Sequence, residues 1–559
     1  MASPRDYVGN NSFRLRDRLM LGGFLLAILL PGTIGVSLFD RDEGWYAQTT
    51  REMVESGDWI IPRYLGESRY YKPPLMFWCS AVSVLTFGWS EFALRLPGVL
   101  ATLAAMLVLA EFAARQWGRR AGYGSAVVAG TCLGPNLAGG LMLPEGYLLL
   151  FVTLAMICWL RKLGSATASE AQRGSSAFGY GFWISAALAF LAKGPAMLVV
   201  MGPCFLAFLW TEPPRGSTLV QRVRHVWPGP GWYLGLLIGA PWYVAVACLD
   251  WAEFKADFID YHTVSRLREP IEGHRGFPGY YIVTGLILLW PWAALMPSAI
   301  ASAWRTRRDE AVTRRLLVWL VVPWLAFELI STKLPYYVLP LLPPMAMLTG
   351  RELARVTSVP SLRFRFEPTT YYVWLGGIAF AGAAFSCFAI WFRGAPSALA
   401  LGAAGAVLLL AAVMCSWARM APSWRMRAGI VLAAMVVFYQ VIGWWAVPRA
   451  EPLRLSRRIA DHINATAREN DIVLADGFAE PSMFFYLDHK GRELTVRDGR
   501  IRHAGASFIL VADEQKLVSL RDVLTIDQSN GQFIEGFNYV RGRHVRVWVG
   551  RARANVISE

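Results

Sequence analysis

The chain has 559 residues, of which 55% are hydrophobic and only 17% are charged. A soluble domain of this length carries more charge, so the composition excludes an ordinary soluble protein and is typical of a membrane protein. The formal net charge is +15, but the basic residues fall in short runs between apolar segments. We therefore interpret them as a topology signal and expect no nucleic-acid partner.

Apolar segments long enough to cross a bilayer begin with Leu19–Phe39 and recur along the chain, for example at Leu316–Ile330 and Ile430–Val447. No small-residue cleavage site follows the first segment, so we expect a membrane span there and not a cleaved signal peptide. If all basic clusters face the cytoplasm and Lys72–Gly88 is an amphipathic segment on the outer surface, the chain makes about 13 crossings. The clusters are Arg14–Arg18, Arg115–Arg120, Arg161–Lys162, Arg215–Arg224, Arg305–Arg315, Arg351–Arg365 and Arg419–Arg427.

Carboxylates gather directly after the first apolar segment, at Asp40, Asp42 and Glu43. Acidic residues in the first turn of a solvated helix are common, and that is the ordinary explanation. At the exit of a membrane span, however, they suit a general base, a metal ligand or a clamp for a cationic transition state. Ionisable residues at a membrane boundary are usually functional, so we predict catalytic roles for Asp42 and Glu43.

Cations stand beside proline breaks at the predicted outer ends of several spans. Arg69 and Lys72 precede Pro73-Pro74, Lys193 lies in Lys193-Gly194-Pro195, and Lys333 lies in Thr332–Tyr337. Prolines stiffen the backbone and fix where the lysines point. Taken singly, each lysine could be a snorkelling anchor. Together they offer several cations for one anion, such as a phosphate.

Two further outward segments carry ionisable residues. Glu145 is a lone acid between two predicted spans, and we predict a catalytic role for it. The loop Tyr261–Arg275 adds His262, Arg266 and His274. A histidine pair near carboxylates could bind a divalent ion, but no ligand spacing requires one. We therefore predict no required cofactor and retain His262 and His274 as the metal candidates.

The chain changes character from Pro448 onward. Leu453–Arg468 has helical periodicity, Ile472–Ala475 and Phe508–Val511 are typical of buried strands, and Val545–Val549 is typical of an alternating strand. We predict a polytopic α-helical transmembrane domain over 1–447, with the active site in a first outer loop at 40–94. A soluble periplasmic α/β domain follows over 448–559.

The motifs of the first outer loop resemble those of a known family. Asp42-Glu43-x-x-Tyr46-Ala47, Arg51-Glu52-Met53, Gly57-Asp58-Trp59 and Lys72-Pro73-Pro74 are similar to this loop in bacterial GT-C glycosyltransferases. The resemblance is to the protein mannosyltransferase and lipid A aminoarabinose transferase group. It continues through Ser90–Pro97, Lys193-Gly194-Pro195 and Thr332–Tyr337, and covers about Met20 to Gly350. The predicted GT-C plan of spans followed by an outer domain resembles the aminoarabinose transferases.

This resemblance implies an enzyme that takes a sugar from a polyprenyl-phosphate carrier and transfers it to an envelope acceptor such as lipid A. The site would face the periplasm from the bacterial inner membrane. Asp42 would be the principal catalytic carboxylate. The residues implied to hold the carrier phosphate are Lys72, Lys333, Tyr46 and one of Tyr336 or Tyr337, with Arg266 as a further candidate. Arg69 and Lys193 join this set because they belong to the same group of outward cations.

The sequence departs from the family pattern around the expected site. Tyr71 stands where aminoarabinose transferases have a Glu that helps to bind a metal, and this departure argues against a zinc site here. Glu145 replaces the Asp usual in the second outer loop, and Arg69 replaces a Tyr. The donor sugar and the acceptor therefore stay open.

Alternatives from other classes remain. A transporter or lipid flippase would also have many spans and buried charge, but such proteins often have repeated halves with broken helices, and the sequence has no such symmetry. A protein O-mannosyltransferase-like enzyme would use a protein acceptor, and a non-catalytic assembly protein would use the C-terminal domain as a contact surface. For an enzyme, no covalent nucleophile is evident, which predicts a single displacement with inversion.

Overall fold

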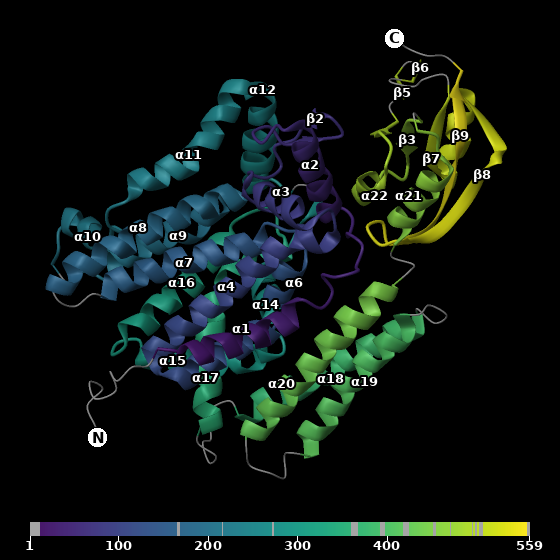
Figure 1. Cartoon of the computed structure of the whole chain (residues 1–559). Coiled ribbons are helices and arrows are strands. Elements are labelled where there is room, and N and C mark those ends of the chain that lie inside the picture. Colours follow the sequence, from purple (N-terminus) through teal and green to yellow (C-terminus); the bar gives the residue numbers. More distant parts are fainter. Residues whose placement is uncertain are drawn as a thin grey trace.

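The protein is described here by a computed structural model in which helices make up most of the chain and a small sheet lies near its C-terminus (Figure 1). The structure describes residues 12–164, 168–214, 216–270, 273–358, 367–391, 397–417, 424–450, 454–469, 471–494, 496–497, 500–501 and 507–555. Parts of three predicted basic clusters, at 215, 359–366 and 418–423, lie outside the described residues.

Six described helices are long and apolar enough to cross a membrane. They are α4 (Glu91–Trp117), α7 (Glu145–Gly164), α11 (Trp232–Leu249), α18 (Glu367–Trp391), α19 (Ser397–Trp417) and α20 (Trp424–Val441), the last continuing through η7 (Ile442–Ala446) and η8 (Val447–Arg449). A seventh would combine α14 (Tyr280–Leu288) with η4 (Trp292–Leu295) and α15 (Met296–Thr306), which are bent by 116°. The chain is thus built as a multi-span membrane protein, while the 13 crossings and their orientation stay predictions.

Further helices complete the helical part. They are α1 (Leu15–Leu29), α5 (Arg119–Thr131), α6 (Leu133–Gly140), α8 (Ala168–Lys193), α9 (Ala196–Thr211), α10 (Leu219–Val226), α12 (Trp251–Phe254), η2 (Lys255–Ser265), α13 (Arg266–Arg268), α16 (Ala311–Glu328), η5 (Pro335–Leu341) and α17 (Leu342–Ser358). The first helix ends earlier than the predicted span, which extended to Phe39. Pro31 cannot continue a helix, and Gly32 has a φ of 85°, so the chain leaves the helix there.

The segment after α1 builds a small layer at one end of the helices. It contains α2 (Asp42–Ser56), the hairpin β1 (Arg63–Tyr64) and β2 (Glu67–Ser68), and α3 (Leu75–Phe87). Acidic residues begin α2, where they complement the helix dipole, and Gly57 ends it with a φ of 70°. With 13 residues, α3 is too short to span a bilayer alone, and this length is consistent with the amphipathic segment predicted there.

The C-terminal region forms a five-stranded sheet with the order β4-β3-β7-β9-β8. Its elements are α21 (Leu455–Thr466), β3 (Val473–Asp476), α22 (Pro481–Tyr486), β4 (Gly491–Glu493), β7 (Phe508–Asp513), α23 (Glu514–Ser519), η10 (Leu520–Asp522), β8 (Leu524–Asn538) and β9 (Arg543–Ala554), with a separate pair β5 (Val496–Arg497) and β6 (Arg500–Ile501). The predicted helix and the three predicted strands are confirmed. The division of the chain at 447/448 into two domains stays a prediction.

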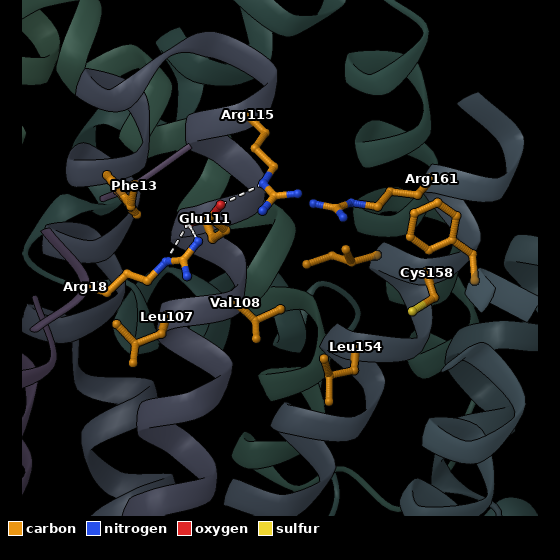
Figure 2. A pocket seen from close by; sticks show the side chains of 11 residues that line it. Phe13, Arg18, Leu107, Val108, Glu111, Arg115, Leu154, Cys158 and Arg161 are labelled. Atoms are coloured by element: carbon orange, nitrogen blue, oxygen red, sulfur yellow. Dashed lines mark hydrogen bonds and ion pairs between the residues drawn. The ribbon is translucent and has the colours of Figure 1, made fainter. Parts of the chain in front are cut away.

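Basic side chains gather at the ends of α4 and α7 that lie farthest from Asp42. Figure 2 shows Arg18, Arg115 and Arg161 around Glu111 in a pocket there. Arg115 is near the C-terminal end of α4, and Glu91 begins the same helix, so the two are separated by about 36 Å at 1.5 Å per residue. That is close to the thickness of a hydrocarbon core. The charge segregation agrees with the pattern from which the topology was predicted.

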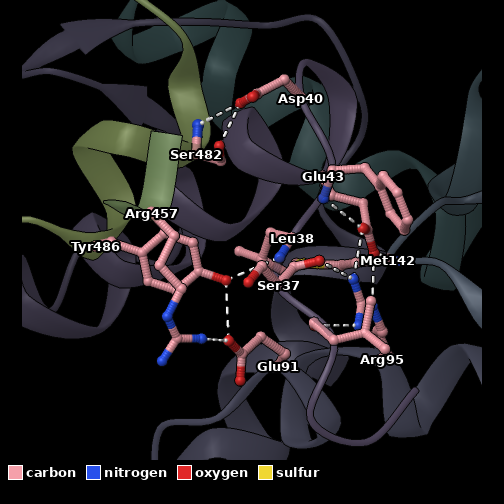
Figure 3. A network of polar contacts seen from close by, with 12 residues as sticks. Ser37, Leu38, Asp40, Glu43, Glu91, Arg95, Met142, Arg457, Ser482 and Tyr486 are labelled. Carbon is pink, nitrogen blue, oxygen red and sulfur yellow. Dashed lines mark hydrogen bonds and ion pairs between the residues drawn. The ribbon is translucent and has the colours of Figure 1, made fainter. Parts of the chain in front are cut away.

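The sheet region packs directly on α2 (Figures 1 and 3). Asp40, two residues before α2, accepts hydrogen bonds from the Ser482 backbone at 3.0 Å, from the Ser482 hydroxyl, and from the Ser456 hydroxyl at 2.7 Å. Arg51 donates to the carbonyls of Phe485 and Leu487, each at 2.9 Å. A Cβ on Gly44 would lie 2.3 Å from the Ser482 nitrogen. Glycine is therefore what allows α2 and α22 to touch.

We expect Gly44→Ala to destabilise the protein by about 1–3 kcal/mol, because the added methyl meets backbone that cannot rotate away. Thermal unfolding of the detergent-solubilised full chain, followed by tryptophan fluorescence, measures the effect. Gly429→Ala is the matched control, since a Cβ there meets nothing within 4 Å. Equal unfolding temperatures for the two variants would contradict this packing.

Candidate functional site

The first turn of α2 places two neighbouring carboxylates in different environments. Glu43 is buried, and its oxygens accept hydrogen bonds from the Phe39 nitrogen at 2.9 Å, the Met142 nitrogen at 2.6 Å, and Arg95 Nε and Nη2 at 2.8 and 2.7 Å (Figure 3). Arg95 is also fully buried and donates to the carbonyls of Val36 and Ser37. With its oxygens engaged in this way, Glu43 fixes the start of α2.

Asp42 is half-buried and belongs to a different group of residues. Burial raises the pKa of the Tyr46 and Tyr336 hydroxyls, and the charges of Asp42 and Glu145 raise both further. The same two carboxylates act favourably on the Lys72 ammonium. The structure therefore brings Asp42, Glu145, Tyr46, Tyr336 and Lys72 into one electrostatic neighbourhood.

Glu145 begins α7 and pairs with the last residue of α8. Its Oε1 lies 2.5 Å from Lys193 Nζ, and both side chains are buried. Among the described residues, Glu145 Oε2 has no hydrogen-bond partner. Lys193 Nζ also lies 4.5 Å from the centre of the Tyr336 ring. One oxygen of this buried pair thus remains available to a bound group.

Tyr71 is the aromatic centre of the site. Lys72 Nζ lies 3.6 Å from its ring centre, and the guanidinium carbons of Arg69 and Arg266 lie 5.4 and 5.5 Å away. Tyr46 stacks against it with centroids 6.1 Å apart, and His262 meets it edge-on at 4.5 Å. The negative face of an aromatic ring stabilises cations without neutralising them, so these cations can still attract an anion.

The protonation of Lys72 is unusually sensitive to this environment. Burial lowers its pKa to about 7, with further lowering by the Lys193 and Arg266 charges, although Asp42 and Glu145 oppose the shift. Within the described residues its ammonium makes no ion pair. A buried lysine among other cations is costly unless an anion joins it, so this arrangement favours binding of a negatively charged group.

Other predicted phosphate ligands have separate partners. Lys333 Nζ pairs with Glu328 Oε2 at 2.8 Å and donates to the Glu328 carbonyl at 2.9 Å, beside the Tyr281 ring. Arg69 lies 4.0 Å above the Trp45 ring. Arg266 Nη1 donates to the Tyr337 hydroxyl at 3.3 Å. Arg266 and Tyr337 therefore lie beside Tyr71 and Lys72, whereas the Lys333 ammonium lies with Glu328 and Tyr281.

The two metal candidates do not share a ligand set. His262 Nε2 lies 3.0 Å from Asp257 Oδ1, and burial lowers the His262 pKa although Asp257 opposes this. The His274 carbonyl accepts a hydrogen bond from the Lys333 nitrogen at 3.0 Å. In the part of the chain that the structure describes, no three His, Cys, Asp or Glu side chains are grouped to hold a metal ion.

An apolar groove ends beside the site. Its volume is about 760 Å³, and its walls include Trp183, Phe190, Pro195, Tyr243, Phe254 and Phe258. A Cβ on Gly194 would lie 2.9 Å from Phe258 and 3.7 Å from Pro73. Since Gly194 follows Lys193 and Pro73 follows Lys72, the groove leads to the cations. A long apolar ligand with an anionic head would fit this combination.

Two important residues were absent from the predicted set. Tyr71 was noted only as a departure from the family pattern, yet it is the centre around which the cations gather. Asp40 was noted among the early carboxylates, but its contacts are with Ser456 and Ser482. The aromatic residue next to Lys72 in the sequence is a signal from which the role of Tyr71 could have been predicted. No local sequence pattern predicts the contacts of Asp40 with the C-terminal region.

Comparison with known proteins adds independent information. The family model described as dolichyl-phosphate-mannose-protein mannosyltransferase matches residues 33–262. The structure of ArnT from Cupriavidus metallidurans bound to undecaprenyl phosphate superposes with a TM-score of 0.72 at 19% identity, covering 95% of this chain and 97% of that chain. The chain therefore has the fold of this ArnT structure.

The chain also resembles proteins named undecaprenyl phosphate-alpha-4-amino-4-deoxy-L-arabinose arabinosyl transferase. The Proteus mirabilis (strain HI4320) protein of this name, numbered 2, is 29% identical over 64% of this chain and 63% of its own length. The Aeromonas hydrophila protein is 30% identical over 58% of this chain and 57% of its own. The chain thus matches less than two thirds of these relatives' lengths. Together the comparisons confirm the predicted resemblance to the protein mannosyltransferase and lipid A aminoarabinose transferase group.

Arg95→Met should destabilise the protein by about 3–5 kcal/mol, because it leaves the buried Glu43 charge without its partner. The double variant Glu43→Met/Arg95→Met removes both charges and should recover much of that loss. Urea or thermal unfolding of the full chain in detergent measures both. The assignment of Glu43 to a structural pair fails if the single variant is as stable as wild type.

Proposed function

We propose that this protein is an inverting glycosyltransferase that moves a sugar from a polyprenyl-phosphate carrier to an envelope acceptor such as lipid A. The observation that carries the proposal is the group of Lys72, Lys193 and Arg266 beside Asp42, at the end of an apolar groove. The groove suits an isoprenoid chain and the cations suit its phosphate. The names of the relatives and of the structural neighbour support the same donor class.

The proposed setting is the bacterial inner membrane, with about 13 crossings by the positive-inside rule. Residues 1–447 would form the transmembrane domain, with the active-site loop at 40–94, and 448–559 would form a periplasmic α/β domain. The opposite placement of Asp42 and of the basic cluster around Arg115 supports this orientation. Neither the topology nor the placement of these charges identifies the donor sugar, so aminoarabinose is one candidate among related sugars.

Glycosyl transfer passes through an oxocarbenium-like state while the leaving group gains negative charge. For a phosphate leaving group, cations are more useful than a proton donor. Lys72, Lys193 and Arg266 would hold that phosphate, and burial strengthens their attraction for it. Glu145 would orient Lys193, to which it is bonded at 2.5 Å. Tyr46, Tyr336 and Tyr337 would border the phosphate.

Asp42 is the proposed catalytic carboxylate, which would orient the acceptor hydroxyl and remove its proton. If the acceptor is already an ionised phosphate, Asp42 would instead position it or stabilise the developing positive charge. Glu43 would act as a positioning residue through Arg95. Lys333 would have a peripheral role because its ammonium pairs with Glu328. Arg69 lies over the Trp45 ring and 5.4 Å from the Tyr71 ring, so it would border the phosphate site. The proposed mechanism requires no metal.

A transporter or flippase would also bind a polyprenyl phosphate at such a site, and a protein acceptor would suit the mannosyltransferase side of the group. The family model that matches residues 33–262 bears on the protein acceptor, whereas no contact among the described residues favours a transporter or flippase. Both alternatives are separated from the main proposal by asking whether a covalent bond to a glycolipid forms.

The first test is sugar transfer from a panel of polyprenyl-phosphate sugars by the purified full chain with envelope lipids. We expect Asp42→Asn to bind donor and lose at least about a hundredfold in turnover, in the range of general-base catalysis. Asp260→Asn is the matched control, because Asp260 is exposed and pairs with Lys255. Wild-type turnover in Asp42→Asn would refute its role, and a product with retained anomeric configuration would refute single displacement.

Donor binding should weaken as the pH rises above about 7. The phosphodiester of the donor keeps one charge throughout this range, but the Lys72 pKa of about 7 means that the free site loses its proton there. Bound phosphate raises that pKa, so each pH unit above 7 should raise the donor Kd by up to about tenfold. Lys72→Arg keeps its charge and should flatten the profile. Calorimetry between pH 6 and about 9 measures the donor Kd. A wild-type Kd that does not change with pH would contradict the prediction.

A further inference from the structure

Two parallel strands of the C-terminal sheet send their connections to opposite faces. After β3 the chain enters α22, whose Met483 and Phe484 pack on the face that carries Val473 and Val511. After β7 it enters α23, whose Leu517 packs with Leu510 on the other face. β3 and β7 are neighbours. In open α/β sheets, ligands bind in the crevice that such a reversal opens at the carboxyl ends of the strands.

A cavity of about 540 Å³ occupies this crevice. Asp476 and Asp513, the last residues of β3 and β7, line it. Its other charged walls come from the helical part and from the rest of the sheet region, and they include Arg41, Glu480, Glu493, Lys516, Arg541 and Arg543. Trp45 of α2 also lines it. The cavity therefore lies between the sheet and the helix that begins with Asp42.

Among the described residues, the carboxylates nearest to the guanidinium groups at this cavity lie beyond the length of a strong hydrogen bond. Arg541 Nη1 and Arg543 Nη2 lie 3.6 and 3.7 Å from the same oxygen of Asp513, and Arg41 Nε lies 4.0 Å from Glu480. A charge-assisted hydrogen bond is about 2.7–2.9 Å long, as between Arg95 and Glu43. The donors of these arginines are therefore available to a second anion.

The carboxylates that line the cavity further restrict the chemical class of ligand that it can bind. Glu480 is buried, and one of its oxygens is held by Asn538 Nδ2 at 2.9 Å, which leaves the oxygen near Arg41 at the cavity. A bare anion would be repelled by Asp476, Glu480 and Glu493, and a basic peptide would be repelled by the arginines. A sugar that carries anionic groups satisfies both sets, because its hydroxyls donate to carboxylates and its phosphates accept from guanidiniums.

We propose that this crevice binds the phosphorylated saccharide headgroup of the acceptor glycolipid. The assignment of the ligand as acceptor rests on the proposed transferase function. Arg41 immediately precedes Asp42, and the Trp45 ring meets the Tyr71 ring with centroids 6.3 Å apart. A headgroup in the crevice would extend away from the membrane with one end beside the transfer site. The C-terminal region thus selects the acceptor while the groove selects the donor.

The test compares wild type with Arg541→Gln/Arg543→Gln in nanodiscs, using the full chain. Arg546→Gln is the matched control, because Arg546 lies on β9 with Arg543 but pairs with Glu514 and Glu535 and is not among the residues lining the cavity. One readout is calorimetric binding of a water-soluble glucosamine disaccharide with two phosphates, compared with the same disaccharide without phosphate. The other is KM for bisphosphorylated lipid A, with donor Kd measured in parallel.

We expect the double variant to lose at least about tenfold in bisphosphate disaccharide affinity and to raise acceptor KM by a similar factor. Donor Kd should not change, and the control should behave as wild type. Unchanged affinity in the double variant or equal binding of the phosphate-free sugar would each overturn the assignment. Headgroup binding without any sugar transfer would instead overturn the proposed function and leave the anionic saccharide site supported.

Discussion

The buried pair of Glu43 and Arg95 is the constraint on which the site depends. A carboxylate and a guanidinium that are both shielded from water must satisfy each other, and here they do so bidentately while Arg95 also holds the carbonyls of Val36 and Ser37. This fixes the first turn of α2 against α4. Because the next side chain on a helix points about 100° away, fixing Glu43 also decides where Asp42 points.

The cations gain their significance from the same burial. Burial, together with the charges of Lys193 and Arg266, lowers the Lys72 pKa to about 7, so positive charge is held there at a cost. A phosphate would relieve that cost when it binds, and the same charges would stabilise the further negative charge that develops on a departing phosphate. The same cations would then both bind the donor phosphate and stabilise it as the leaving group, and they would not need to move during the reaction.

Much of the architecture could be predicted because it follows from local patterns. Buried strands such as β3 and β7 are continuous apolar runs, and the proline-flanked cations mark the ends of helices. The finer assignments depend on partners far along the chain. Asp42 and Glu43 are equivalent in the sequence, and only Arg95, 52 residues after Glu43, separates their roles. Lys333 looks like Lys72 in its motif, but a carboxylate five residues earlier, Glu328, takes its ammonium. Tyr71 becomes central only when distant loops fold around it.

The same long-range packing connects the C-terminal region, where the acceptor is proposed to bind, to Asp42. Burial raises the pKa of Asp40 to about 6, and hydrogen bonds from Ser482 and Ser456 oppose the shift, so this carboxylate is held by the C-terminal region at an electrostatic cost. Only Arg41 separates Asp40 from Asp42, and Gly44 brings α22 into contact with the same helical turn. A displacement of α22 would therefore reach Asp42 through the backbone. If the crevice between the sheet and α2 holds the acceptor, its occupation acts on the segment that positions Asp42, the proposed catalytic carboxylate. Acceptor binding and catalysis would then be coupled through this segment.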